Sequence, residues 1–416
     1  MGVREAIDPT KLAEAGWGVI FAGHSPQPIK DALGALLNLR QQQAGEFFRI
    51  YDGAEGYQPG ELKSRFLARH GVGPGPADPG KMPYYLLIVG SPEAIPYRFQ
   101  IQLDVQYAVG RIDFGDDLEA YMRYAQSVVA AENGRAHLPR RAVFFAVKNP
   151  EELHTRLATE HLVKPLARQM AEAAPQWEIE TVIGEGATKA FLLEFLGGPK
   201  VPAVLFTASH GLTFPAGHPR QQTEQGAILC SDWPGPFTRG GEIPQEFYVA
   251  AQDIGQAAKP FGLITFHFAS FSAGTLQHAQ DAKRILGERI VIAPEPFVAN
   301  LPASLLSHSE GGALAVIGYV DTVWSNFLEA KAGIREGVHV FKHAITSLLQ
   351  GNPVGLALEY FNERYAKLAT VLSDELEEIE FGKTADPYEL SGLWTENNDA
   401  RSLVIVGDPA VRVSQG

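Results

Sequence analysis

Short runs of apolar residues recur along the whole chain, separated by longer stretches that mix apolar and polar positions. Seven runs rich in Val, Ile, Leu and Phe stand out, at residues 18–22, 84–90, 142–147, 203–207, 263–268, 313–318 and 403–407. Continuous apolar runs of this length are typical of strands that are buried on both faces. Strands that alternate with helices predict an α/β fold, with a mostly parallel sheet flanked by helices.

Three of the intervening stretches, residues 117–132, 158–173 and 326–349, predict amphipathic helices, because their apolar residues are three and four positions apart. Residues 71–80 are so rich in Gly and Pro that they can only form a loop. Residues 133–141 end a helix and precede a new strand, which makes them the best domain boundary. We therefore expect two α/β subdomains, an amino-terminal one at residues 1–138 and a larger one at residues 139–416.

Composition and charge narrow the class of protein. Of the 416 residues, 45% are hydrophobic, which is enough for real α/β cores. The formal net charge of -13 argues against a nucleic-acid or anionic-membrane partner. The first thirty residues lack a basic stretch leading into an apolar one, and no apolar run reaches about 18 residues, so we expect a cytoplasmic protein. The single cysteine, Cys230, excludes an intramolecular disulfide and a thiolate-rich zinc site.

Two of the apolar runs are followed by residues that could act in catalysis. His210 and Gly211 follow the run at 203–207, and Ser270 follows the run at 263–268. A right-handed crossover brings the ends of two such parallel strands side by side, and a histidine near a nucleophile is the minimal unit of acyl-transfer catalysis. The amides of Gly211 and Ser270 could then bind an oxyanion. The alternative is structural: the histidine is a satisfied core residue and the small residues around Ser270 allow close helix packing.

These motifs resemble, in order, those of gingipain-type cysteine peptidases of the caspase-like clan. His210-Gly211 match the "HG" pair that closes one strand in that clan, and residues 268–270 match the "AC" that closes the next, except that Ser270 replaces the cysteine. Residues 86–90, 109–112, 117–132, 311–318 and 404–409 resemble further strands and a helix of the gingipains. The resemblance covers roughly residues 84–413.

The resemblance implies a caspase-like endopeptidase that cleaves peptide bonds with a Cys-His dyad. The residue at 270 would attack the carbonyl, His210 would handle protons, and Trp324 would form a wall of the specificity pocket. No cofactor and no metal are implied. The expected partners are a protein or peptide substrate and an activator, small molecule or protein, in a setting such as bacterial defence.

The sequence departs from the family in the region that, in the family, binds the basic side chain of the substrate. The acidic residue expected there has no clean counterpart in residues 151–160. Glu151, Glu152 and Glu160 could orient His210 or line a pocket, but acidic residues at the start of a helix are more often solvated or stabilise the helix dipole. Asp232 and Asp321, each in a loop after a predicted strand, are rival candidates for substrate binding. The segment between His210 and Ser270 is longer than the family core needs, which predicts a lid or a binding loop.

A serine at position 270 changes the expected chemistry. A thiol has a pKa near 8.5 and ionises readily beside an imidazole, whereas a serine hydroxyl needs a histidine held by a carboxylate. Three interpretations follow: a variant inactivated by design, a natural pseudoenzyme, or a peptidase that uses serine. The alternative from another class is a non-catalytic pseudoprotease that acts as a ligand- or partner-binding sensor.

Other motifs point to no competing chemistry. His267 lies within the strand before Ser270 and is expected to be a core residue, while His24 follows the first strand and is a rival base without a family counterpart. No zinc-hydrolase motif, glycine-rich dinucleotide loop, phosphate-binding loop or Gly-x-Ser-x-Gly elbow is present, so these enzyme classes are disfavoured.

Overall fold

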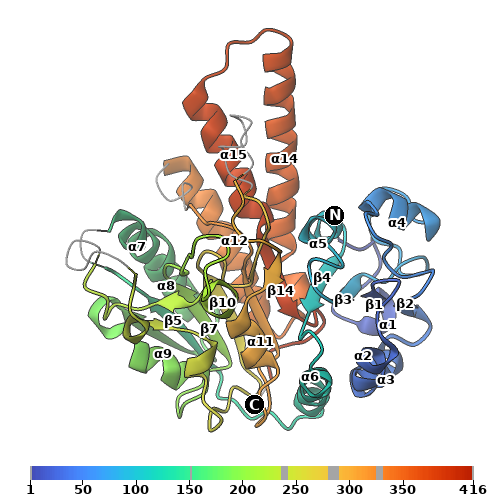
Figure 1. Cartoon of the computed structure of the whole chain (residues 1–416), viewed down its shortest axis with the longest axis horizontal. Coiled ribbons are helices and arrows are strands. Elements are labelled where there is room, and N and C mark those ends of the chain that lie inside the picture. Colours follow the sequence, from blue (N-terminus) through green and yellow to red (C-terminus); the bar gives the residue numbers. More distant parts are fainter. Residues whose placement is uncertain (1, 150–151, 236–241, 280–289, 325–330, 415–416) are drawn as a thin grey trace.

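The computed structural model describes residues 2–149, 152–235, 242–279, 290–324 and 331–414, and for residues 331–337 only the backbone. A ten-stranded sheet forms its centre (Figure 1). The strands follow one another across the sheet in the order β2 (Phe48–Tyr51), β1 (Trp17–Phe21), β3 (Tyr85–Val89), β4 (Ala108–Ile112), β14 (Leu403–Gly407), β13 (Ala315–Tyr319), β10 (Ile264–Phe268), β7 (Val204–Ala208), β5 (Arg141–Ala146) and β6 (Glu178–Ile183). Two short antiparallel pairs lie apart from it: β8 (Ile228–Leu229) with β9 (Tyr248–Val249), and β11 (Gly274–Thr275) with β12 (Phe297–Val298).

The sheet consists of two parallel halves that run in opposite directions. Strands β2, β1, β3, β4 and β14 are parallel to one another, and so are β13, β10, β7, β5 and β6, whereas β13 and β14 are antiparallel. The carboxyl ends of the two halves therefore lie at opposite edges of the sheet. His24, which follows β1, lies at the other edge from the residues that follow β7 and β10.

The seven strands predicted from apolar runs are all present. The central strands are buried along their whole length, which explains why each reads as a continuous apolar run. The resemblance to the gingipains also predicted β4. Strands β2 and β6 lie at the two ends of the sheet and are only partly buried, so Glu178 and Glu180 interrupt the apolar pattern of β6.

Helices cover both faces of the sheet (Figure 1). They are α1 (Leu12–Ala15), α2 (Gln27–Ala32), α3 (Gly34–Ala44), α4 (Lys63–Arg69), α5 (Tyr97–Asp104), α6 (Leu118–Glu132), α7 (Leu153–Leu157), α8 (Lys164–Ala173), α9 (Lys189–Leu196), α10 (Gln221–Glu224), α11 (Asn300–Leu306), α12 (Lys331–Leu349), α13 (Val354–Ala357), α14 (Glu359–Glu380) and α15 (Pro387–Arg401). The predicted helix at 117–132 corresponds to α6. That at 158–173 corresponds to a π-helical turn at Ala158–Val163 followed by α8. The helix predicted at 326–349 corresponds to α12, with residues 326–330 outside the described residues. Of the described helices, none is both long and apolar enough to cross a membrane.

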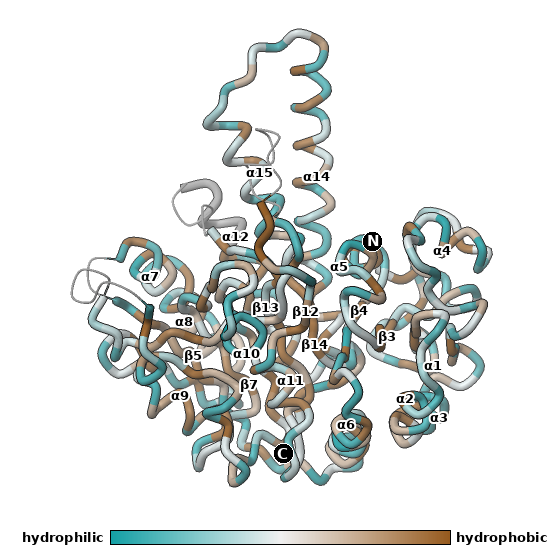
Figure 2. Tube along the Cα trace, viewed as in Figure 1, coloured by the Kyte–Doolittle hydropathy of each residue, from teal (hydrophilic) through white to brown (hydrophobic). Residues whose placement is uncertain are grey.

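An aromatic ladder joins the strands that position the site. Phe144, Phe206 and Phe266 are register partners on β5, β7 and β10, and their ring centroids are 5.8 and 5.3 Å apart. Phe341 of α12 and Phe361 of α14 pack on Phe266 from the same face. Such interlocked large side chains hold neighbouring strands in one register, because a shift would leave voids. Figure 2 shows this apolar centre in brown.

A buried carboxylate ties the last strand to the amino-terminal half of the sheet. Asp408, directly after β14, accepts hydrogen bonds from Trp17 Nε1 at 2.9 Å and from Arg40 Nε at 2.7 Å. Burial lowers the pKa of Arg40, but Asp408 and Glu132 outweigh it and leave that pKa above its ordinary value. The sheet is thus continuous across the predicted division at residue 138, and the two-subdomain division stays a prediction.

Replacing Asp408 tests this clamp. In the Asp408→Ala variant the buried Arg40 loses its fully buried counter-ion and keeps the more exposed Glu132, so we expect the free energy of unfolding to fall by about 3 kcal/mol. Denaturant unfolding followed by circular dichroism measures the change. The exposed control Asp31→Ala should change stability by no more than about 0.5 kcal/mol. Equal stabilities of the two variants would contradict the role assigned to Asp408.

Candidate active site

Strand register sets the position of the candidate site. In the β7–β10 pair Ala208 lies opposite Phe268, and the amide of Ser209 donates to the carbonyl of Phe268 at 3.2 Å. Continuing this register by two residues places His210 opposite Ser270. Both residues leave the carboxyl ends of adjacent parallel strands. The strand order also reverses between β5 and β7. In α/β proteins such a reversal leaves a crevice just beyond the carboxyl ends of the strands.

The backbones at residues 211 and 270 approach each other more closely than side chains would allow. A Cβ on Gly211 would lie 1.7 Å from the carbonyl oxygen of Ser270, and a Cβ on Gly226 would lie 2.0 Å from that of Phe271. Phe271 itself has φ of 58°, a left-handed conformation that is strained for a bulky residue. The turn after β10 is therefore wedged against the segment that carries His210, and glycine is required at position 211.

Two backbone amides are available at this junction. Gly211 pairs with Ile228 in an isolated antiparallel bridge, in which the hydrogen bonds are made by the flanking residues, from Leu212 to Ala227 and from Leu229 to His210. The N–H of Gly211 consequently points away from β8. Among the hydrogen bonds of the described residues, neither this amide nor that of Ser270 acts as a donor.

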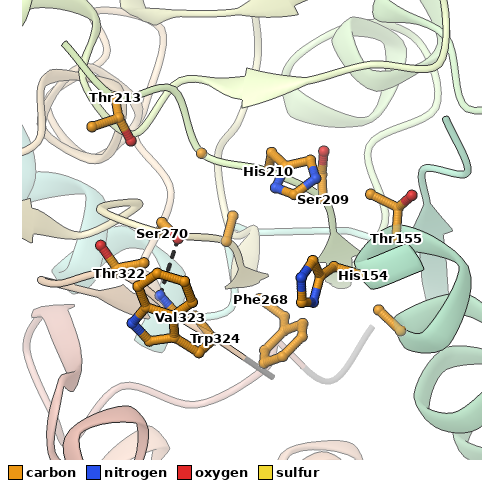
Figure 3. A pocket seen from close by; sticks show the side chains of 13 residues that line it. His154, Thr155, Ser209, His210, Thr213, Phe268, Ser270, Thr322, Val323 and Trp324 are labelled. Carbon is orange, nitrogen blue, oxygen red and sulfur yellow. Dashed lines mark hydrogen bonds between the residues drawn. The ribbon is translucent and has the colours of Figure 1, made fainter. Parts of the chain in front are cut away.

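The hydroxyl of Ser270 faces the loop after β13. Its Oγ accepts a hydrogen bond from the amide of Val323 at 3.0 Å, drawn as a dashed line in Figure 3. Within the described part of the chain no hydrogen bond joins Ser270 to His210. The two side chains line one cavity without sharing a proton in this conformation.

A carboxylate holds the imidazole of His210. Glu152, the residue before α7, lies with Oε2 2.5 Å from His210 Nε2. Burial raises the pKa of Glu152, but the hydrogen bond and charge of His210 outweigh it, so the pKa lies below its ordinary value. A histidine fixed by an ionised carboxylate is oriented and better able to carry a positive charge.

His210 and Ser270 line a cavity of about 240 Å³. Figure 3 shows His154, His210, Ser270 and Trp324 around it. The lining also includes Thr155, Ala158, Ser209, Gly211, Thr213, Phe268, Ala269, Thr322 and Val323. The lining thus comes from the carboxyl ends of β7, β10 and β13 and from helix α7, which follows β5.

Similarity to known proteins is found at the level of the fold. No protein-family model and no curated protein matches the chain. The crystal structure of the Arg-specific cysteine proteinase gingipain R (RgpB) is similar with a TM-score of 0.56 and 11% identity, covering 99% of this chain and 80% of that chain. The complex of the RgpB pro- and mature domains from Porphyromonas gingivalis (0.54; 11%; 95% and 79%) and a structure described as a protease (0.53; 11%; 95% and 78%) are also similar.

The chain has a gingipain-like fold. This confirms the predicted α/β fold and the likeness of its architecture to the caspase-like peptidases. At 11% identity the similarity concerns the fold, so the roles of individual residues are argued from their geometry in this chain.

The structure separates the acidic candidates. Glu152 contacts His210, whereas Glu160 pairs with Lys164 and Lys148 on the surface, and Glu151 lies outside the described residues. The lining includes neither Asp232 nor Asp321. Asp232 accepts from the amide of Lys189 at the start of α9, and buried Asp321 accepts from the amide of Thr322 and from Asn398.

Two further histidines lie near the candidate site, and only His154 differs from what the sequence predicts. His267 is fully buried, with Nδ1 2.8 Å from the hydroxyl of Thr207, and burial lowers its pKa to about 4, as suits the predicted core residue. The sequence pattern does not identify His154 as a site residue, yet it lines the cavity together with His210. Its position one residue into the helix after β5, at the same edge as the other strand ends, is the signal that could have identified it.

The long segment after His210 forms a small unit with its own core. Leu212, Phe214, Trp233 and Tyr248 are buried together around the β8–β9 pair. Of its described residues before β10, only Gly211 and Thr213 line the cavity, and residues 236–241 lie outside the described part. The lid function expected for this segment stays a prediction.

The loop that carries Trp324 is held from the other side by α15. The amide of Trp324 donates to Asp399 Oδ1 at 3.1 Å, and Asn398 Nδ2 donates to Asp321 Oδ2 at 3.4 Å. The amide of Val320 donates to the carbonyl of Ser402 at 2.9 Å. The end of α15 therefore fixes one wall of the cavity.

The close approach at residue 211 can be tested by adding a methyl group. Gly211→Ala would force the Ser270 turn away, so we expect a loss of about 2–3 kcal/mol in unfolding free energy. The control Gly186→Ala adds a Cβ whose nearest neighbour, in Val182, is 3.7 Å away. Urea unfolding of both variants measures the effect, and a Gly211→Ala protein as stable as the control would refute the contact.

The Glu152–His210 pair predicts a pH-dependent contribution to stability. Because the folded-state pKa of Glu152 lies below its ordinary 4.5, its contribution is present above that pH and is lost as pH falls through the folded value. We expect Glu152→Gln to be less stable than wild type by about 1 kcal/mol at pH 7, with the difference vanishing in acid. Thermal unfolding at stepped pH measures this. The surface control Glu160→Gln should cost less, and equal losses at pH 7 would contradict the pairing.

Proposed function

We propose that this chain carries a peptide-bond-cleaving site of the cysteine-peptidase type, with residue 270 in the position of the nucleophile. The observation that carries the proposal is the convergence of His210–Gly211 and the Ser270 turn on one cavity, with Glu152 on the imidazole. The gingipain-like fold supports it, because that fold belongs to cysteine peptidases.

The geometry suggests how the parts would act. With a thiolate at position 270, the sulfur would attack the scissile carbonyl while the amides of Gly211 and residue 270 bind the developing oxyanion. His210, held by Glu152, would then protonate the leaving amine. A rotation of the side chain at 270 away from the Val323 amide would precede attack.

Serine at position 270 weakens this chemistry, because its hydroxyl is far less acidic than a thiol. A chain with Ser270 is therefore expected to bind peptides and to turn them over slowly. The Glu152–His210 contact specifically favours a second candidate, hydrolysis by the serine itself, since a serine needs a histidine that is oriented by a carboxylate.

The lining of the cavity also indicates which substrate side chain would be preferred before the cleaved bond. Its described lining contains no carboxylate, and Asp232 and Asp321 are engaged elsewhere. Trp324 is 43% exposed and offers an aromatic face beside Phe268. These features favour an uncharged side chain over the arginine for which gingipain R is described as specific.

Restoring the thiol tests the proposal. The Ser270→Cys variant should cleave a proteome-derived peptide mixture, mainly after uncharged residues, as read by mass spectrometry of the products. Adding His210→Ala should lower both cleavage and alkylation of the introduced thiol by iodoacetamide by about 100-fold or more.

Matched variants separate the alternatives. Ser209→Cys places a thiol in the same cavity, and its alkylation should be unaffected by His210→Ala. Labelling of wild-type Ser270 by a fluorophosphonate would identify the serine-based reaction. A Ser270→Cys protein that is inert toward the mixture, with alkylation independent of His210, would instead indicate a non-catalytic sensor.

A further inference from the structure

Helices α14 and α15 form a hairpin that stands off the body of the molecule (Figure 1). α14 contains 22 residues, so it is about 33 Å long. At its start Phe361 packs on the aromatic ladder of the sheet. Beyond the first turns, α14 and α15 pack mainly against each other among the described residues.

The outer part of the hairpin buries little and exposes large apolar side chains. Between residues 366 and 391 only Leu372 and Leu390 are buried. Val371 and Leu376 are exposed, and at the tip Phe381 and Tyr388 are 83% and 90% exposed. Figure 2 shows apolar and polar residues mixed along this arm. Apolar side chains of this size on a protruding element mark an interaction surface.

The tip is strongly acidic. Residues 374–389 contain seven carboxylates and one lysine, Lys383, which itself bridges Glu375 and Glu378. Such a surface repels nucleic acid and anionic lipid and attracts a basic protein surface that also offers apolar contact.

A hollow lined by basic and apolar side chains lies at the foot of the hairpin, the end at which α14 begins. It has a volume of about 330 Å³ and is lined by Leu62, Lys63, Ser64, Arg98, Gln102, Val105 and Tyr365. Burial lowers the pKa of Lys63 to about 8, which Asp104 offsets only in part, so an incoming carboxylate would stabilise its charge. Tyr365 belongs to α14, about 24 Å along that helix from Phe381.

We propose that two copies of this chain associate through their hairpins as a symmetric dimer, with the acidic tip of each hairpin seated in the hollow at the foot of the other. Antiparallel alignment of two hairpins about a two-fold axis brings each tip beside the partner's foot, because tip and hollow lie at the two ends of one helix. Each copy then uses the same two patches, as a closed symmetric interface requires. The exposed apolar side chains become buried in an antiparallel four-helix bundle. This association is independent of the proposed catalytic function.

Sedimentation velocity over a concentration series tests the dimer. Wild type should dimerise, more weakly at high salt because the tip and the hollow attract by charge. Phe381→Ala/Tyr388→Ala should raise the dissociation constant at least about tenfold, since exposed aromatic anchors carry much of such binding energy. Phe191→Ala, an exposed aromatic change on α9, is the control and should leave it unchanged.

A charge-swap experiment distinguishes a lost interface from a variant that fails to fold. Ser64→Glu/Arg98→Glu makes the hollow acidic. Replacing Asp374, Glu377, Glu380 and Glu389 together by Lys leaves three carboxylates against five lysines at the tip and makes it basic. Each of these two variants alone should be monomeric. Mixed together they should restore the dimer, because each acidic patch then meets a basic one. A wild-type protein that is monomeric throughout, a dimer that none of these changes weakens, or a mixture that stays monomeric would overturn the proposal.

Discussion

The candidate site depends on one constraint, the contact between the backbones at residues 211 and 270. Their separation is fixed by the parallel register of β7 and β10, which the buried Phe144, Phe206 and Phe266 rings hold. Since a one-residue shift in a strand turns every side chain to the other face, the register decides whether His210 and Ser270 meet at all. Core packing several residues away thus determines the geometry of the cavity, and glycine at 211 and a left-handed Phe271 accommodate the resulting crowding.

The direction reversal between β13 and β14 concentrates the polar residues at one edge. The strand ends of one half supply His210, Ser270 and the Val323–Trp324 loop, whereas the carboxyl ends of the other half face away. The reversal also brings the start of β14, and with it the end of α15, to the same edge as the cavity. Asp408 at the far end of β14 keeps this strand attached to the amino-terminal half.

Much of this arrangement could be predicted from sequence, because continuous apolar runs identify strands that are buried on both faces, and the residues after two such runs include His210 and Ser270. Other features depend on information that a local pattern lacks. The contact of Glu152, and not of Glu160, with His210 is decided by where α7 begins. The positions of Asp232 and Asp321 are decided by hydrogen bonds to the backbone at the start of α9 and to Thr322. The apolar pattern does not predict the edge strands β2 and β6 or the α14–α15 hairpin, because charged residues interrupt the apolar residues of these elements.

The hairpin and the cavity share a physical connection. The last turn of α15 donates no catalytic group, yet Asp399 and Asn398 hold the 321–324 loop, on which the wall formed by Trp324 and the Ser270–Val323 hydrogen bond both depend. Anything that stabilises one position of α15 therefore stabilises one position of that loop. Because such coupling is reciprocal, a peptide that orders the loop would in turn favour one position of the hairpin. The link is made at the base of the hairpin, where Asn398 and Asp399 are buried in the last turn of α15.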